Sequence, residues 1–200
     1  MKNKTVSFLM IALFYSGMGL KAQFFDGGIA AGVSTGTVKM SDMNTALINT
    51  AKGNSITGFE GGLFSRFHFT PFYLKPMALI NYQSGDVNFY NKDGTTTKTN
   101  FNDGKLEVPV LLGFHFLGIL NVEAGPLYNW VFMTNTSENN IKVQPSGVGY
   151  RIAANVELSR LLLGLCYQGL MNKSSGSSTT TFQVPNELIF QIALNLGKKK

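Results

Sequence analysis

The sequence predicts an all-β fold, an eight-stranded antiparallel up-and-down transmembrane β-barrel that follows a signal peptide. Three observations predict it. Segments of about ten residues alternate between apolar and polar side chains, which gives each strand one apolar and one polar face. Only 14% of the residues are charged, compared with roughly 25% in soluble domains. The connections between segments alternate between very short and long, as they do in transmembrane barrels.

Eight segments carry the alternation, and their lengths suit a tilted strand that crosses a bilayer, which needs about 9–11 residues. The segments are Gly27–Val33, Gly58–Phe69, Phe72–Ser84, Lys105–Phe116, Ile119–Phe132, Gly147–Leu158, Leu161–Leu170 and Phe182–Leu196. No stretch shows sustained helical periodicity, and no break in composition marks a second domain. Residues 23–200 are therefore predicted to form one barrel domain.

The segment Lys105–Phe116 shows the alternation most clearly. Its even-numbered positions are all apolar, whereas Lys105, Glu107 and His115 share the other face. We expect the apolar face to meet lipid and the charged face to line the interior. The same alternation would also serve a soluble sandwich whose apolar face is turned inward.

The lengths of the connections separate these two cases. Three connections are very short, namely Thr70-Pro71, Leu117-Gly118 and Ser159-Arg160. Four are long and polar, namely Ser34–Thr57, Gly85–Gly104, Met133–Pro145 and Met171–Thr181. Short turns at one end and long loops at the other are typical of a transmembrane barrel, with the short turns in the periplasm.

The N-terminus has the pattern of a secretory signal peptide over residues 1–22. Lys2 and Lys4 precede the apolar stretch Val6–Leu20, and cleavage is predicted after Ala22. The alternative is an uncleaved anchor helix, but that needs about 20 apolar residues. Cleavage would remove three lysines and no acidic residue, so the net charge would fall from +6 to +3.

The remaining positive charge lies mostly at the C-terminus, in Lys198, Lys199 and Lys200. The body of the chain is therefore nearly neutral, and no nucleic-acid partner is predicted. The single Cys166 excludes an intramolecular disulfide, and we expect it to be a small buried apolar residue.

The interior of an eight-stranded barrel is just wide enough to be filled by side chains, so an open diffusion pore is not expected. Charges inside it should pair, because an unpaired buried charge is costly. We interpret the inward-facing set as a structural charge network, with a proton or ion path as the alternative. The network consists of Glu60, Arg66, Lys75, Glu107, His115, Glu123, Arg151, Glu157 and Glu187.

Aromatic residues gather near both ends of the predicted strands. Such rows are typical of the two interfaces of a membrane, although aromatic residues also favour strands in general. The predicted girdles consist of Phe67, Phe69, Phe72, Phe114, Phe116, Tyr128, Trp130, Phe132 and Tyr150.

Four prolines, Pro76, Pro109, Pro126 and Pro185, fall inside predicted strands. A closed barrel has no free edge, and proline has no backbone N–H to donate. Each of these prolines is therefore expected to mark a bulge or a local defect in pairing.

No catalytic, cofactor or metal site is predicted, and the protein is not expected to be an enzyme. The only histidines, His68 and His115, lie beside the short turns. They could face inward at the same end, but no third metal ligand is evident. Neither a Gly-rich phosphate loop nor a paired-cysteine metal motif is present.

Two motifs resemble the PorT-like outer-membrane β-barrel family of Bacteroidota. They are Leu106-Glu107-Val108-Pro109-Val110-Leu111 and Glu123-Ala124-Gly125-Pro126. The resemblance implies an eight-stranded barrel with extracellular loops, and one branch of the family is linked to the type IX secretion machinery. The chain departs from the usual pattern at its C-terminus. Its last strand ends Leu194-Asn195-Leu196, without the aromatic residue that the barrel assembly machinery reads.

Three functions follow from these observations. The leading hypothesis is a structural or interaction protein of the bacterial outer membrane, accessory to a secretion system. It would be held by membrane lipid and would contact a protein partner through the loops Ser34–Thr57 and Gly85–Gly104. The alternatives are a narrow transport conduit and a secreted soluble, lipocalin-like binder of an apolar ligand.

Overall fold

The computed structural model describes residues 24–41, 48–53, 55–91, 96–116, 118–136, 142–143, 146–171 and 181–197. The predicted signal peptide and its cleavage site lie outside these residues. The described part of the chain is built from strands, and it contains no helix long and apolar enough to cross a membrane. The strands are β1 Phe25–Ser41, β2 Ile48–Gly53, β3 Ser55–Phe69, β4 Phe72–Asn91, β5 Thr96–Phe116, β6 Leu120–Thr136, β7 Lys142–Val143, β8 Ser146–Leu158, β9 Leu161–Leu170 and β10 Thr181–Asn195.

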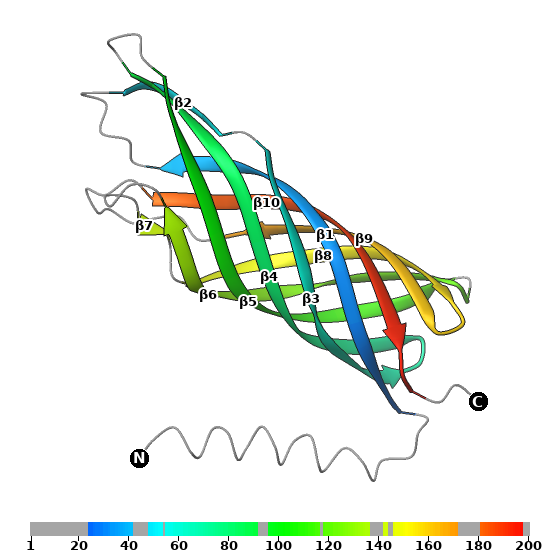
Figure 1. Ribbon diagram of the computed structural model, residues 1–200. Coiled ribbons are helices and arrows are strands. Elements are labelled where there is room, and N and C mark those ends of the chain that lie inside the picture. The colour runs from blue at the N-terminus through cyan, green and yellow to red at the C-terminus, as the bar shows by residue number, and fades with distance from the viewer. Residues whose placement is uncertain are drawn as a thin grey trace, which may run out of the picture.

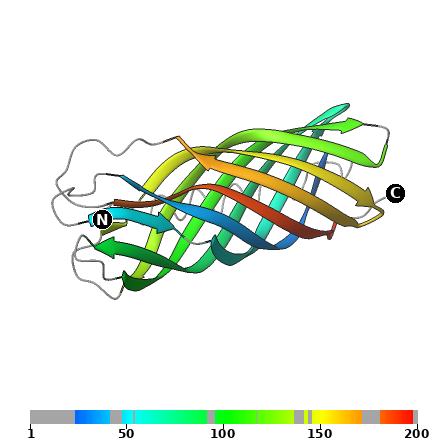
Figure 2. The same ribbon diagram turned by 90° about the horizontal axis from the view of Figure 1, so that it is seen from above.

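Eight of these strands form a closed antiparallel barrel, as the sequence predicts. The order around the barrel is β1, β3, β4, β5, β6, β8, β9 and β10, and β10 pairs with β1 from Gly28↔Asn195 to Ser41↔Thr181. Figures 1 and 2 show the strands wound about a common axis, with the short turns and the end of β10 at one end. We call this the short-turn end. Neighbours in sequence are neighbours in the barrel, so the topology is up-and-down.

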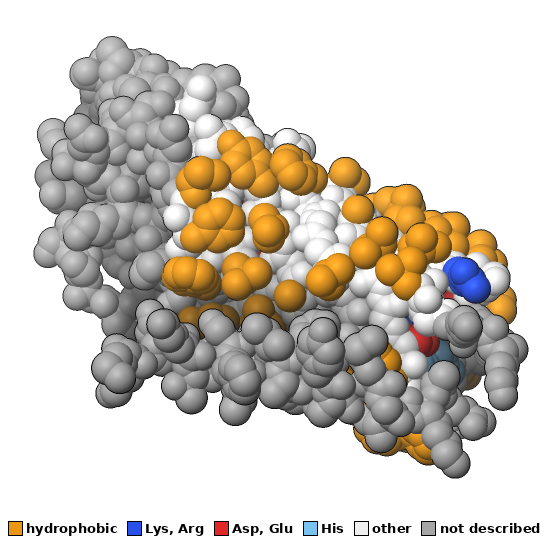
Figure 3. Space-filling model, turned by 60° about the horizontal axis from the view of Figure 1, so that its bottom comes forward, with side chains coloured by type: hydrophobic (Ala, Val, Ile, Leu, Met, Phe, Trp, Pro, Cys, Tyr) orange, Lys and Arg blue, Asp and Glu red, His pale blue; other side chains and the backbone are white. Residues whose placement is uncertain are grey.

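Side chains alternate between the wall's two faces along every barrel strand. In β8, for example, Arg151 and Ala153 are buried while Val148 and Ile152 are exposed. Figure 3 shows the exposed hydrophobic side chains spread over the outside of the wall. The apolar face is thus turned outward and the charged face inward, which is the arrangement of a barrel in lipid.

The strands run well past their predicted ends, so the predicted loops at Ser34–Thr57 and Gly85–Gly104 are wrong in extent. β4 and β5 stay paired as far as Tyr90↔Thr96, and β2 adds to the outer part of β4. These extensions carry few apolar residues, because beyond a lipid layer both faces of a strand can be hydrated. Apolar alternation therefore does not reveal them.

The prolines perturb pairing in two different ways. Pro76, Pro109 and Pro126 each interrupt the pairing between their own strand and one adjacent strand. Two residues on each of the two strands are unpaired there, and beyond them the register continues unchanged. The expected bulge is absent there, and only the local defect is present. Pro185 lies opposite the register shift between Thr37 and Lys39 of β1, where a bulge accommodates the missing donor.

Candidate functional site

The lumen of the barrel holds two polar clusters with an apolar layer between them. The middle cluster comprises Glu60, Asn81, Lys105, Glu107, Arg151, Gln168, Glu187 and Gln191. The mouth cluster, at the short-turn end, comprises Asp26, Arg66, His68, Tyr73, Lys75, His115, Asn121, Glu123, Glu157 and Asn195. The apolar layer comprises Ala30, Phe64, Met77, Leu79, Leu111, Leu162 and Ala193.

The order of residues along the strands fixes this layering. In β3, for example, Phe64 lies between Glu60 of the middle cluster and Arg66 of the mouth cluster. In β10, Ala193 lies between Gln191 and Asn195 in the same way. Because inward positions recur every second residue, the two clusters are at different depths of the lumen.

Arg151 and Glu60 form one half of the middle cluster. The Arg151 guanidinium donates to both carboxylate oxygens of Glu60, at 2.6 and 3.0 Å, and both side chains are fully buried. Gln191 Nε2 donates a further hydrogen bond of 2.7 Å to Glu60. A bidentate pair with additional hydrogen bonds is the geometry that offsets the cost of burying two charges.

Lys105 joins two strands on the other side of the middle cluster. Its Nζ lies 2.5 Å from Glu187 and 3.1 Å from Glu107. Gln168 Nε2 donates to both carboxylates at 3.0 Å, and its Oε1 accepts from Arg151 at 3.2 Å. Gln168 therefore links the two halves into one network.

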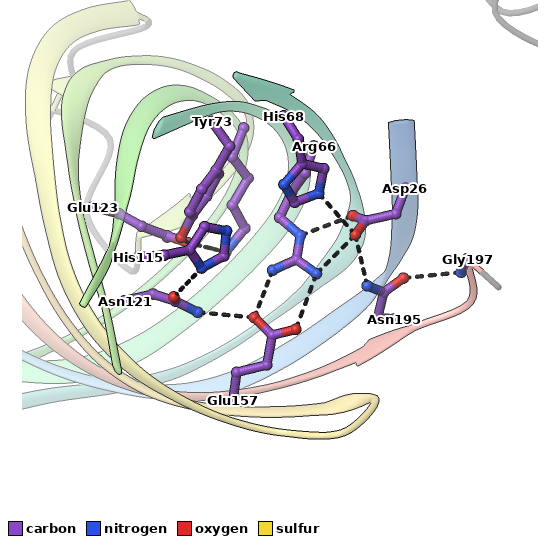
Figure 4. Close-up of polar contacts among 11 residues, drawn as sticks. Asp26, Arg66, His68, Tyr73, His115, Asn121, Glu123, Glu157, Asn195 and Gly197 are labelled. Carbon is purple, nitrogen blue, oxygen red and sulfur yellow. Dashed lines mark hydrogen bonds and ion pairs between the residues drawn. The ribbon is translucent and has the colours of Figure 1, made fainter. Parts of the chain in front are cut away.

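Arg66 is the centre of the mouth cluster (Figure 4). It donates to Asp26 at 2.8 and 3.0 Å, and on its other side to Glu157 at 3.0 Å. Asn195 donates to Asp26, and its own Oδ1 accepts from the backbone N–H of Gly197. These bonds tie the end of β10 to β1 across the seam that closes the barrel.

A second pair lies deeper in the mouth cluster, around Glu123. Lys75 Nζ lies 3.0 Å from both carboxylate oxygens, and the Tyr73 hydroxyl donates to one of them at 2.6 Å. Tyr73 can reach Glu123 because Gly113 stands between them in the register and has no side chain. A Cβ at Gly113 would lie 2.1 Å from the Tyr73 ring, so only glycine fits beneath it.

The two histidines complete the mouth cluster. His68 Nε2 lies 3.0 Å from Asp26 Oδ2, and His115 Nδ1 lies 2.6 Å from Asn121 Oδ1. Asn121 in turn donates to Glu157 at 2.9 Å. Among the described residues, no group of three or more His, Cys, Asp or Glu side chains could hold a metal ion.

Comparison with protein families identifies this barrel. The model of the outer membrane protein beta-barrel domain matches residues 21–183. The chain belongs to this outer-membrane family. The protein is therefore located in the outer membrane, where the short-turn end faces the periplasm and the other end faces outward.

Three solved structures match most of this chain at low sequence identity. Ail, the attachment invasion locus protein of Yersinia pestis, is 9% identical, with 87% of this chain and all of that chain covered and a TM-score of 0.43. Neisserial surface protein A is 10% identical, covers 85% of this chain and 97% of its own, and has a TM-score of 0.41. The translocator domain of NalP from Neisseria meningitidis is 10% identical over 96% and 95%, with a TM-score of 0.38. A search of curated proteins gives no match.

The structure places all nine residues of the predicted charge network in the lumen, but in two groups. The middle cluster holds Glu60, Glu107, Arg151 and Glu187. The mouth cluster holds Arg66, Lys75, His115, Glu123 and Glu157.

Sequence reasoning missed several members of both clusters. Lys105 shares the inward face of β5 with Glu107, and this parity was a sufficient signal for including it. Asp26 was missed because the first strand was predicted to begin at Gly27, whereas β1 begins at Phe25. The buried amides, such as Gln168, carry no charge and gave no signal beyond their position.

Most residues of the predicted aromatic girdles lie exposed on the outer wall. Phe69, Phe72, Phe114 and Phe116 surround the periplasmic turns, and Tyr128, Trp130 and Phe132 lie on the outer half of β6. Phe67 and Tyr150 are half-buried against other aromatic rings. Phe67 packs on Phe25, and Tyr150 packs on Tyr167.

Proposed function

We propose that the protein is a non-conducting, non-enzymatic scaffold of the outer membrane. Its barrel anchors an extracellular sheet extension that contacts a protein partner. The proposal rests on the contrast between a lumen that holds buried ion pairs and strands that continue as a paired sheet beyond it.

The filled lumen argues against a transport conduit. The apolar layer of Phe64, Leu79 and Leu111 lies between the two polar clusters, and each of these side chains is almost fully buried. An ion that crossed this layer would lose its hydration without gaining a partner, which is costly. The charges on either side are already engaged with one another.

The extension supplies a rigid surface outside the membrane. β4 and β5 are paired without interruption from Tyr82↔Gly104 to Tyr90↔Thr96. This hairpin spans roughly 25 Å at about 3.4 Å per residue. β2 pairs with β4 along the same stretch, from Gly53↔Val87 to Ile48↔Asn91. A sheet of three strands holds its shape better than a loop, so it is suited to presenting a fixed surface to a partner.

The finer form of the proposal is that this partner belongs to a secretion apparatus. It is supported by the resemblance to PorT-like barrels. The motif residue Glu107 belongs to the middle cluster and Glu123 to the mouth cluster, so the motifs serve the wall of the barrel. The outer sheet would then provide the contact with the apparatus.

A hairpin deletion tests the scaffold role. Residues 86–100 are replaced by Asn-Gly, which joins Gly85 to its partner Phe101 through a two-residue turn. The shortened chain should still enter the outer membrane and still migrate faster unboiled than boiled on a cold SDS gel. In a strain that lacks the native chain, it should fail to restore the normal profile of proteins released to the medium.

The matched control removes residues 173–179 from another outer connection, and it should restore that profile. Full restoration by the hairpin deletion would overturn the scaffold proposal. Stable conductance steps of the wild-type protein in planar bilayers would overturn the non-conducting part.

A further inference from the structure

The mouth cluster brings the chain's two histidines together from strands that are not neighbours. His68 comes from β3 and His115 from β5, yet their ring centroids are 5.7 Å apart and their planes differ by 9°. Figure 4 shows both rings among the polar side chains of the mouth cluster. The function proposed above gives this pair no role.

The hydrogen bonds fix which nitrogen of His68 is free. Nε2 lies 3.0 Å from Asp26 Oδ2. The Asp26 carboxylate accepts bonds from both Arg66 and Asn195, so it acts as an acceptor. Nε2 must then carry the proton, which leaves the lone pair on Nδ1.

A chain of bonds fixes the tautomer of His115 as well. Asn121 Nδ2 donates to Glu157, so Asn121 turns its carbonyl oxygen toward His115. That oxygen can only accept, so His115 Nδ1 is the donor. The lone pair of His115 is therefore on Nε2.

A single guanidinium orients both imidazoles. Arg66 donates to Asp26, and Asp26 accepts a hydrogen bond from His68. Arg66 also donates to Glu157, which accepts a hydrogen bond from Asn121. Asn121 in turn accepts a hydrogen bond from His115. Histidines that bind a metal through one ring nitrogen almost always donate the N–H of the other ring nitrogen to a fixed acceptor in this way. Both histidines of the mouth cluster have such an acceptor.

The charge of the mouth cluster also favours a cation. Arg66 and Lys75 contribute two positive charges, whereas Asp26, Glu123 and Glu157 contribute three negative ones. When both imidazoles are neutral, the mouth cluster therefore has a net charge of −1. It is reachable from the periplasm, because the side chains of His68 and Asp26 are 23% and 17% exposed.

We propose that His68 Nδ1 and His115 Nε2 bind one divalent late transition-metal ion, such as Cu²⁺ or Zn²⁺, at the periplasmic mouth of the barrel. Neutral imidazole suits these metals, and water completes the coordination. Metal–nitrogen bonds of about 2.1 Å hold two imidazole centroids roughly 5–6 Å apart. The observed separation of 5.7 Å falls in that range. The rings are stacked with their planes 9° apart, so at least one of them must turn about its Cβ–Cγ bond to bring both lone pairs onto one ion.

Copper titration of the tag-free, folded protein tests the site. Because the chain has only two histidines, every imidazole seen by the metal must be one of them. We expect one Cu²⁺ per chain, with pulsed electron paramagnetic resonance detecting two imidazoles on the same ion. His68→Asn and His115→Asn should each leave one imidazole and weaken affinity at least tenfold.

Asp26→Asn keeps both imidazoles and removes an orienting charge, so affinity should fall about 10–100-fold with two imidazoles still detected. Tyr128→Phe, on the lipid face, should bind as the wild type does. Heat-modifiable migration verifies that each variant is folded. The site is refuted if the wild-type spectrum shows fewer than two imidazoles, or if the His68→Asn/His115→Asn double variant binds copper equally well.

Discussion

The two polar clusters of the lumen follow the same plan in different surroundings. Each is built around one arginine that holds carboxylates from other strands, Arg151 in the middle cluster and Arg66 in the mouth cluster. In the middle cluster, Glu60 and Arg151 are both fully buried. In the mouth cluster, Asp26 remains partly exposed.

The difference shows that access to water determines how strongly similar ion pairs depend on their partners. Water cannot replace a lost partner in the middle cluster, so each member depends entirely on the others. At the mouth, water from the periplasm can solvate a freed carboxylate. The middle cluster is thus suited to fixing the barrel's closure, and the mouth cluster to tolerating an exchangeable ligand.

Removing Arg151 should produce the largest loss of stability. Arg151→Met leaves the Glu60 carboxylate buried without its cation, and we expect a loss of about 3–5 kcal/mol in the free energy of unfolding. Urea unfolding in lipid vesicles measures it, with the fluorescence of the single Trp130 as the probe.

The double variant Arg151→Met/Glu60→Gln is the control, because it removes both charges. It should recover most of the lost stability, since replacing both members of a buried pair is often nearly neutral. If the double variant is as unstable as the single one, the loss comes from packing around Arg151 rather than from an unpaired charge.

The equivalent change at the mouth should cost less. Arg66→Met removes the cation from Asp26 and Glu157, and we expect a loss of about 1.5–3 kcal/mol, the range for hydrogen bonds to charged groups. The same unfolding measurement applies. A loss equal to that of Arg151→Met would mean that the mouth is as dry as the middle, and the comparison would fail.

Overfilling the mouth should have a smaller effect. Gly113→Ala places a methyl group 2.1 Å from the Tyr73 ring, which must move and release Glu123. We expect a loss of roughly 1–2 kcal/mol. Gly61→Ala is the matched control, since the atom nearest to its Cβ is the backbone oxygen of Ala30 at 3.8 Å, and its stability should change little. Equal losses in both variants would point to glycine's backbone freedom instead.

The alternation of apolar and polar residues in the sequence predicted which side chains face the lumen and which face outward. In β5 and β6, strict alternation predicted that Glu107 and Glu123 face inward and that Val110 and Val122 face outward. In the closed barrel the two glutamates are buried and the two valines are exposed. Alternation works here because lipid on one side and charges on the other impose opposite demands on successive residues.

The division into two clusters could not be predicted, because it depends on depth and on pairing across the barrel. Glu60 and Arg151 are 91 residues apart, and only the closed register brings them together. The outer sheet was missed for another reason. Between Asp86 and Asn100 no lipid imposes a pattern, so paired strands there have the composition of a loop.

The smallest expected effect concerns salt, and it compares the hydration of the two clusters directly. Double-mutant cycles measure the coupling of Arg66 with Asp26 and of Arg151 with Glu60, at low ionic strength and in 1 M KCl. Exposed charges are screened over a few ångströms at 1 M salt, whereas buried pairs are screened much less. The Arg66–Asp26 coupling should therefore fall by about 0.5 kcal/mol, within the range measured for exposed pairs, while the Arg151–Glu60 coupling stays constant. Salt dependence of both couplings would show that ions reach the middle cluster, which a sealed lumen does not allow.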